Sequence, residues 1–149
     1  MKRLPKFEDD IALSLSTWVE IMKAFNKIRT LEMELIEANN LTIGQFALLE
    51  LLHHRGSQTI GAATKLAMSS PGNMTVVVKN LLKAEMITSE KHDSDKRSAV
   101  LSITPKGSEL IASMFPEHSK RIDSFLSGLT QEEKEVVRAL LRKLNKSLR

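Results

Sequence analysis

Hydrophobic residues recur at intervals of three and four over residues 11–38, the spacing that places side chains in one apolar stripe along a helix. The stripe consists of Ile11, Leu15, Trp18, Met22, Phe25 and Ile28. Asn39 and Asn40 then interrupt the pattern and predict the end of the helix. A long amphipathic helix is therefore expected near the start of the chain.

The clearest helix start in the sequence lies at Thr42. Thr42 and Gln45 have the spacing of a capping box, and Leu41 and Phe46 flank them as a hydrophobic staple. We expect this second helix to run to about residue 54 and to stop before the glycine at position 56. The partly β-branched residues 58–60 then predict a short strand.

The next segment predicts two helices joined by a tight polar turn. Residues 61–66 leave room for about two turns of helix. Ser70 is placed to cap the helix after the turn, with Pro71 as its first residue. Over residues 71–84 one helical face is apolar and the other is polar, positive and free of acid. The apolar face carries Met74, Val78, Leu81 and partly Val77.

After Met86 the hydrophobic period changes from 3.6 to 2 residues, which predicts strands. Residues 98–103 alternate and are able to pair with residues 87–91, so that residues 92–97 form the tip of a β-hairpin.

Two more helices follow the hairpin. Thr104 and Pro105 start a helix that contains Pro116 and is expected to end at Gly128. Thr130 and Glu133 have the spacing of a second capping box, at the start of a last helix. Its apolar stripe consists of Val137, Leu140, Leu141, Leu144 and Leu148.

This order of elements is typical of a winged helix-turn-helix, a mainly α fold with a small β-hairpin. We expect a single domain over residues 1–149, in which residues 41–107 form the DNA-binding lobe. The helices of residues 11–38 and 108–149 flank the lobe, and they are too long to bury their apolar stripes on so small a module. They are therefore expected to be dimerisation helices that pack against each other or a second chain.

The composition of the chain limits the classes of protein to which it can belong. With 149 residues, 42% hydrophobic and 27% charged, the chain fits one soluble domain, and no apolar stretch approaches the ~20 residues of a membrane span. The absence of cysteine excludes disulfides and thiolate metal sites and favours a reducing, cytoplasmic location. The net charge is +4, and residues 56–106 hold seven Lys and Arg against four Asp and Glu.

The sequence does not indicate an enzyme. It has no phosphate-binding loop, no nucleophile motif and no pair of carboxylates in a recognisable structural setting, and no cofactor is predicted.

Three stretches of the sequence resemble the MarR family, the multiple antibiotic resistance regulators of bacteria and archaea. They are residues 41–49, residues 74–81, and Asp95-Lys96-Arg97 followed by residues 103–107. The resemblance covers nearly the whole chain. It implies a homodimeric transcriptional repressor that binds a pseudo-palindromic operator in double-stranded DNA and is released by a small-molecule inducer.

The sequence departs from the family pattern at two positions of the predicted recognition helix. Asn80 stands where the family often has Arg, and Glu85 stands where it usually has the Gly that closes the helix. The second departure predicts a different helix end.

DNA contacts are expected from the recognition helix and from the hairpin. Short polar side chains at the front of a recognition helix reach base edges, while lysines bind phosphates. The helix candidates, including the residues just before it, are Ser69, Ser70, Asn73, Thr75, Val76, Lys79 and Asn80. Arg97 is expected to enter the minor groove with Asp95 holding it in position, and Lys91, His92 and Lys96 are expected to contact phosphates. The alternatives are a solvated helix face and a surface ion pair.

A ligand cavity is expected between the dimerisation helices and the DNA-binding lobe, where members of the family bind aromatic acids and phenols. The candidate lining residues are Trp18, Met22, Phe46, His53, Phe115 and His118. The alternative is that these residues, at helical spacing, belong to the core.

Two other functions remain as alternatives. A metal-responsive regulator would use some of the histidines at positions 53, 54, 92 and 118 with Glu50, Glu117 or Asp123. No metal site is predicted, because the spacing of known metal motifs is missing. The other alternative is a winged-helix protein-interaction module that does not bind DNA.

Overall fold

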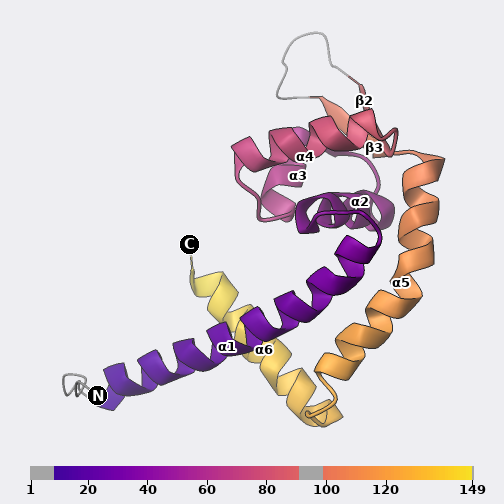
Figure 1. Ribbon diagram of the computed structural model, residues 1–149. Coiled ribbons are helices and arrows are strands. Elements are labelled where there is room, and N and C mark those ends of the chain that lie inside the picture. The colour runs from indigo at the N-terminus through magenta and orange to yellow at the C-terminus, as the bar shows by residue number, and fades with distance from the viewer. Residues whose placement is uncertain (1–8, 91–98, 149) are drawn as a thin grey trace, which may run out of the picture. The chain divides into compact units, whose positions relative to one another are not determined.

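The computed structural model describes residues 9–90 and 99–148, which belong to two compact units, residues 1–40 and residues 41–149. Within the described residues the fold is mainly helical with one small sheet (Figure 1), as predicted. In chain order the elements are α1 (Asp9–Ala38), α2 (Ile43–Arg55), β1 (Gln58–Thr59), α3 (Ile60–Leu66), α4 (Pro71–Lys83), β2 (Ile87–Glu90), β3 (Val100–Ile103), α5 (Pro105–Phe125) and α6 (Gln131–Ser147).

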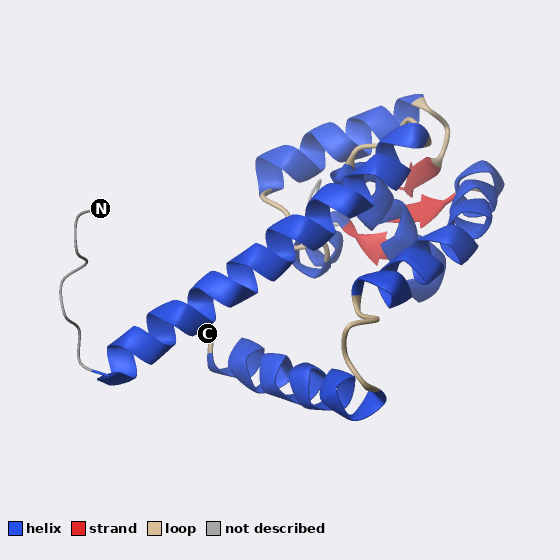
Figure 2. Cartoon of the chain, turned by 60° about the horizontal axis from the view of Figure 1, so that its bottom comes forward, coloured by secondary structure: helices blue, strands red, loops and turns tan. Residues whose placement is uncertain are grey.

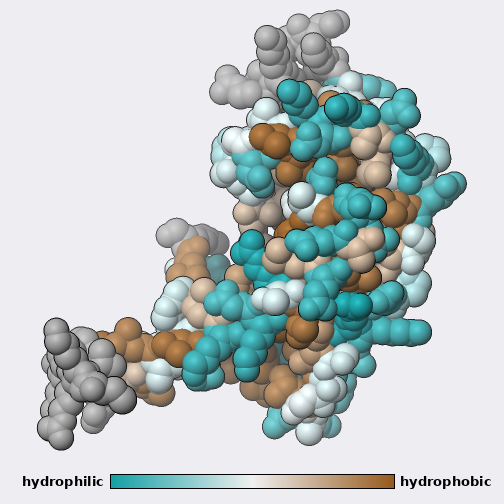
Figure 3. All heavy atoms as spheres, in the orientation of Figure 1, coloured by the Kyte–Doolittle hydropathy of each residue, from teal (hydrophilic) through white to brown (hydrophobic). Residues whose placement is uncertain are grey.

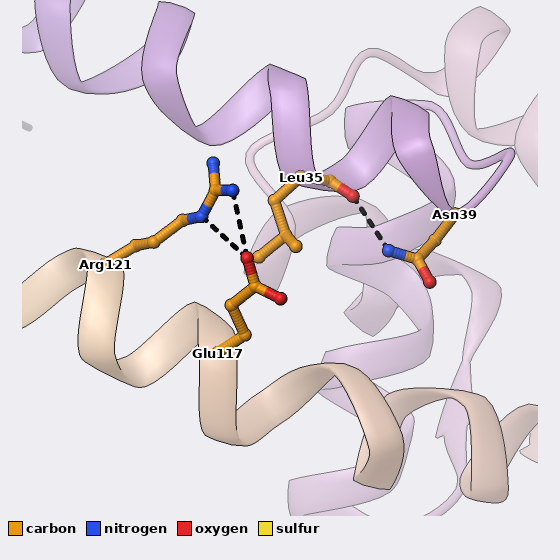
Figure 4. A network of polar contacts seen from close by, with 4 residues as sticks. All are labelled: Leu35, Asn39, Glu117 and Arg121. Atoms are coloured by element: carbon orange, nitrogen blue, oxygen red, sulfur yellow. Dashed lines mark hydrogen bonds and ion pairs between the residues drawn. The ribbon is translucent and has the colours of Figure 1, made fainter.

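The first unit consists of the long helix α1. Most of its large hydrophobic side chains are exposed, and hydrophobic atoms follow its surface in the space-filling view (Figure 3). The helix ends where Asn39 Nδ2 donates a hydrogen bond to the carbonyl oxygen of Leu35 at 2.9 Å (Figure 4). Asn40 follows with a positive φ of 57°, a conformation that Asn tolerates better than most residues. The predicted end of this helix is confirmed.

The core of the second unit lies where α2 meets α4, α5 and the sheet. The largest fully buried side chains of this unit are Leu48, Leu49, Leu52, Met74, Leu81, Leu101 and Ile111. Helices α2 and α4 approach closely at Gly44, where an added Cβ would lie 2.9 Å from Val77 Cγ2 and 3.5 Å from Asn73 Nδ2. A side chain at position 44 would require the Val77 side chain to shift.

The three strands form an antiparallel sheet in the order β1-β3-β2 (red in Figure 2). Ile87 pairs with Ile103 and Glu90 pairs with Val100, so β2 and β3 confirm the predicted hairpin. Strand β1 adds to the other edge of β3 through the pair Gln58 and Leu101.

Hydroxyl side chains cap the five helices α2 to α6. Thr42, Ser70 and Thr130 are N-caps as predicted, and the capping boxes of α2 and α6 are complete. Thr59 caps α3 by accepting a hydrogen bond from the Ala62 N–H at 3.2 Å. This cap corrects the strand prediction, because it makes Ile60 the first residue of α3 rather than the last residue of the strand.

Two other helix ends differ from expectation. Helix α5 ends at Phe125 instead of reaching Gly128, because Leu126 N–H and Ser127 N–H bond to carbonyls only three residues back, which tightens the chain out of the helix. Helix α4 ends in the conformation that a glycine usually adopts after a helix, although Glu85 occupies this position. Glu85 adopts a φ of 57°, and its N–H bonds to the Leu82 carbonyl while Met86 N–H bonds to the Leu81 carbonyl. This is a Schellman motif with a non-glycine residue in the left-handed position.

Candidate nucleic-acid interface

Helix α4 presents a buried face and an exposed face that divide as the sequence predicts. Met74, Val77, Val78 and Leu81 are buried, and Val77, which the sequence placed only partly on this face, is 5% exposed. The candidate DNA contacts on the helix are exposed: Asn73, Thr75, Val76, Lys79 and Asn80. The first half of the exposed face is uncharged, while Lys79 and Lys83 bring positive charge to the second half.

The start of α4 is held by a small hydrogen-bond network. Ser70 Oγ accepts a hydrogen bond from the Asn73 backbone N–H at 3.3 Å and so caps the helix. Asn73 Nδ2 donates to Ser69 Oγ at 2.9 Å, and Thr75 Oγ1 donates to the Pro71 carbonyl at 2.9 Å. The front of the helix therefore holds its polar side chains in fixed positions before any ligand is bound.

The expected contacts at the hairpin tip are Lys91, His92, Asp95, Lys96 and Arg97, and they lie outside the described residues. The two strands that lead into and out of this segment are described, and their pairing continues to Glu90 and Val100.

Aromatic and histidine rings gather between α2 and α5. The ring centroids of Phe46 and His118 are 5.0 Å apart, and those of His54 and Phe115 are 4.9 Å apart. His118 is 8% exposed, and its Nε2 lies 4.0 Å from Glu50 Oε1. We call Phe46, His54, Phe115 and His118 the ring cluster.

The other ligand candidates are placed separately. His53 Nδ1 forms a 3.0 Å hydrogen bond with Ser108 Oγ, which also joins α2 to α5. Trp18 and Met22 lie on α1, where Trp18 is 59% exposed. The sequence indicated His54 only as a possible metal ligand and did not place it among the residues expected to line a ligand cavity.

No group of three or more His, Asp or Glu side chains within residues 9–90 and 99–148 is close enough to hold a metal ion. Two of the carboxylates considered as ligands have cationic partners instead. Glu117 Oε1 accepts hydrogen bonds from Arg121 Nε and Nη2 at 3.1 and 2.9 Å (Figure 4). Asp123 Oδ1 accepts one from Lys134 Nζ at 3.2 Å.

Helix α6 has an apolar stripe that is exposed in the part of the chain that the structure describes. Leu140 is 60% exposed, and none of the side chains of α6 is buried. The exposed hydrophobic residues of the helix and its end are Val136, Val137, Leu140, Leu141, Leu144 and Leu148. Among the described helices, none has the length and apolar composition needed to cross a membrane.

The capped helix α4, the turn before it and the adjacent hairpin define a winged helix-turn-helix DNA-binding protein. Comparisons with known proteins make this assignment specific. Residues 41–99 match the model of the MarR family. The HTH-type transcriptional regulator MhqR of Bacillus subtilis (strain 168) is 30% identical over 131 residues, which cover 88% of this chain and 90% of that protein. The chain belongs to the MarR family of transcriptional regulators.

Two further comparisons concern a relative in sequence and a relative in structure. The HTH-type transcriptional repressor MdtR of Bacillus subtilis (strain 168) is 26% identical over 89% of this chain and 82% of its own length. The crystal structure of NadR in complex with 4-hydroxyphenylacetate is similar with a TM-score of 0.74 and 21% identity, covering 97% of both chains. The second comparison shows a shared fold.

Proposed function

We propose that this DNA-binding regulator is a homodimeric repressor that binds a pseudo-palindromic operator and is released by a small aromatic or phenolic ligand. The observation that carries the proposal is α4, a capped helix with four buried apolar residues behind an exposed face that holds no acid. A helix of this kind fits the major groove, and its acid-free face suits approach to phosphates. The similarity to MdtR, which is named a repressor, supports repression as the outcome of binding.

The exposed hydrophobic residues of α1 and α6 support the homodimer. The apolar residues from Val136 to Leu148 are 40–70% exposed, which is costly in water, because complete burial of such a side chain is worth about 1.5–3 kcal/mol relative to full exposure. A second copy offers the same stripe, which suits a two-fold interface. We infer that residues 11–38 and 108–149 supply the dimerisation helices and that residues 41–107 form the DNA-binding lobe.

The ring cluster supports a ligand of aromatic character. Phe46 and Phe115 offer ring faces and edges, while His54 and His118 offer ring nitrogens to a hydroxyl or carboxylate. The NadR structure holds 4-hydroxyphenylacetate, which is an aromatic carboxylate with a phenolic hydroxyl. We infer that the seam between α2 and α5 forms one side of the binding site in this protein, with Trp18, Met22 and His53 as further candidates.

The proposal is tested with the purified full chain and a library of random duplex DNA. Repeated selection should enrich a sequence with two inverted half-sites about 10 base pairs apart from centre to centre, as a two-fold dimer requires. Enrichment of a single half-site, or of no sequence, would contradict the proposal.

The selected DNA then tests release by a ligand. In a fluorescence anisotropy assay, 4-hydroxyphenylacetate or salicylate should weaken binding, while cyclohexylacetate, which has a carboxylate but no aromatic ring, should leave it unchanged. A response to all three acids alike would indicate an effect of the carboxylate or of ionic strength and would refute an aromatic site.

Two variants distinguish the proposed anchoring of the protein by Arg97 from the proposed reading of bases by Asn73. Arg97→Ala should weaken binding to many sequences alike and reduce the salt dependence, because each neutralised phosphate contributes a slope of about −0.9. Asn73→Ala should lose about 1–3 kcal/mol on the selected operator and little on random DNA. If Arg97→Ala abolished the preference for the operator and Asn73→Ala retained it, the roles assigned to hairpin and helix would be wrong.

A further inference from the structure

We infer that the recognition helix reads A·T base pairs, with Val76 contacting the methyl group of a thymine and Asn73 bonding to an adenine. The inference rests on the proposed sequence-specific binding and adds the class of operator that α4 selects. It is carried by the chemistry of the exposed face and by the hydrogen bonds at the start of the helix.

The N-terminal turns of α4 lack the exposed side chains that read G·C pairs most often. Guanine is read mainly by arginine or lysine and cytosine by glutamate or aspartate, whereas asparagine suits adenine and apolar groups suit the thymine methyl. The exposed residues of α4 are Pro71, Gly72, Asn73, Thr75, Val76, Lys79, Asn80, Leu82 and Lys83. None of them is an arginine or an acid. The two lysines lie in the second half of the helix, behind the N-terminal turns that make base contacts in helix-turn-helix proteins.

Val76 is an apolar side chain at the centre of a polar face. It is 56% exposed, whereas the other two valines of the helix, Val77 and Val78, are buried. Gly72 lies one turn earlier on the same face, and the space around its Cα is open. Among the described residues, no side chain at Gly72 or within 4 Å of its Cβ position covers Val76 on the N-terminal side. The thymine methyl is the one apolar group on the major-groove edges of the base pairs, so it is the partner that fits Val76.

Asn73 has the donor and the acceptor that adenine requires. A side-chain amide carries two N–H donors and one carbonyl oxygen. The bond from Nδ2 to Ser69 Oγ uses one donor at 2.9 Å and fixes the amide at the first turn of α4. The remaining donor matches adenine N7, and the carbonyl oxygen matches the adenine N6 amino group. Because Ser69 already holds the amide, little rotamer freedom is lost when the adenine is bound.

The first experiment is the sequence selected from random DNA by the wild-type protein. Enrichment of A·T pairs at the central positions of each half-site supports the inference. Enrichment of an inverted repeat with G·C pairs at those positions would overturn it while leaving the proposed function in place. Enrichment of no sequence would contradict both the inference of A·T reading and the proposed function.

The second experiment deletes single groups from the selected operator. Replacing the contacted thymine by deoxyuridine removes only the methyl group and should weaken wild-type binding about fourfold, the value of one buried methyl-sized group. Val76→Ala should bind both duplexes alike, and Val76→Ile should again prefer thymine. A wild-type protein that binds both duplexes equally, or a Val76→Ala variant that keeps the preference, would overturn the assignment of Val76.

The matching test for Asn73 replaces the contacted adenine by 7-deazaadenine, which lacks the N7 acceptor. The wild-type protein should lose about fivefold in affinity, as expected for one hydrogen bond, and Asn73→Ala should lose nothing further. Equal losses in both proteins would overturn the assignment of Asn73. Circular dichroism and the melting temperature of each variant confirm that the comparison is between folded proteins.

Discussion

Lys106 Nζ donates a hydrogen bond to the carbonyl oxygen of Ala84 at 2.8 Å and so joins the first turn of α5 to the end of α4. The next two carbonyls are engaged by the same turn. Thr104 Oγ1 donates to Glu85 O at 2.8 Å, and Thr104 N–H donates to Met86 O at 3.0 Å. Three successive carbonyls after the recognition helix thus depend on the start of the helix that carries Phe115 and His118.

Replacing Lys106 by Met removes the bond to Ala84 and keeps most of the side-chain length. We expect operator affinity to fall about threefold to tenfold, the range of one lost hydrogen bond, because the end of α4 is held less firmly. The salt dependence of binding should not change. If Lys106 instead contacted a phosphate, the slope of log affinity against log salt would be smaller by about 0.9 in the variant, which would refute the positioning role.

Replacing Glu85 by Gly should raise the free energy of unfolding by about 1 kcal/mol, because glycine adopts the left-handed conformation without the cost that other residues bear. Ala84→Gly is the matched control. Ala84 has a φ of −80°, so the same substitution one residue earlier should lower stability by about 0.5–1 kcal/mol. Urea unfolding of the three proteins measures both effects. A destabilised Glu85→Gly variant would show that the glutamate side chain outweighs the backbone cost.

The hydrogen bonds to Glu132 at the start of α6 predict that the free energy of unfolding depends on pH. Hydrogen bonds from its own backbone N–H and from the Thr130 side chain hold the pKa of Glu132 below the ordinary 4.5 of a glutamate. A carboxyl group with a lowered pKa in the folded state stabilises the fold above its unfolded pKa, and this contribution is lost as the pH falls through the folded pKa. Glu132→Gln should therefore lose less stability than the wild type between about pH 5 and pH 3. Parallel unfolding curves over this range would contradict the assignment.

The double variant Leu140→Asp and Leu144→Asp should be monomeric or aggregated at micromolar concentrations, because it places charges in the apolar stripe of α6. Ala139→Asp adds a charge on a different face of the same helix and should remain dimeric. Sedimentation velocity distinguishes the species. A folded wild-type monomer at these concentrations would contradict the homodimer itself.

Capping chemistry and the faces of α4 were predictable from the sequence because both depend on residues within a few positions of one another. Thr42, Ser70 and Thr130 bond to backbone groups three residues ahead, so their spacing alone indicated three helix starts. The conformation of Glu85 was not predictable in this way. Its left-handed backbone is supported by Thr104, which lies 19 residues later in the chain.

The ring cluster was also only partly predictable, because some of its features depend on neighbouring residues and others on residues far apart in the chain. Phe115 and His118 were candidates because they share a helical stripe, which is a local property. That His54 meets Phe115, and that Phe46 meets His118, depends on how α2 packs against α5 across more than 60 residues of chain. The sequence alone shows which rings are available on α2 and α5, but it does not show which of them come into contact.

The close approach of α2 and α4 at Gly44 links the packing between these helices to the helix that is proposed to read DNA. A methyl group at position 44 would lie 2.9 Å from Val77 Cγ2, so Val77 would have to shift, and it would lie 3.5 Å from Asn73 Nδ2, in ordinary van der Waals contact. Gly44→Ala should therefore change how tightly the regulator binds DNA through the packing of Val77, and without replacing any side chain that is proposed to contact a base.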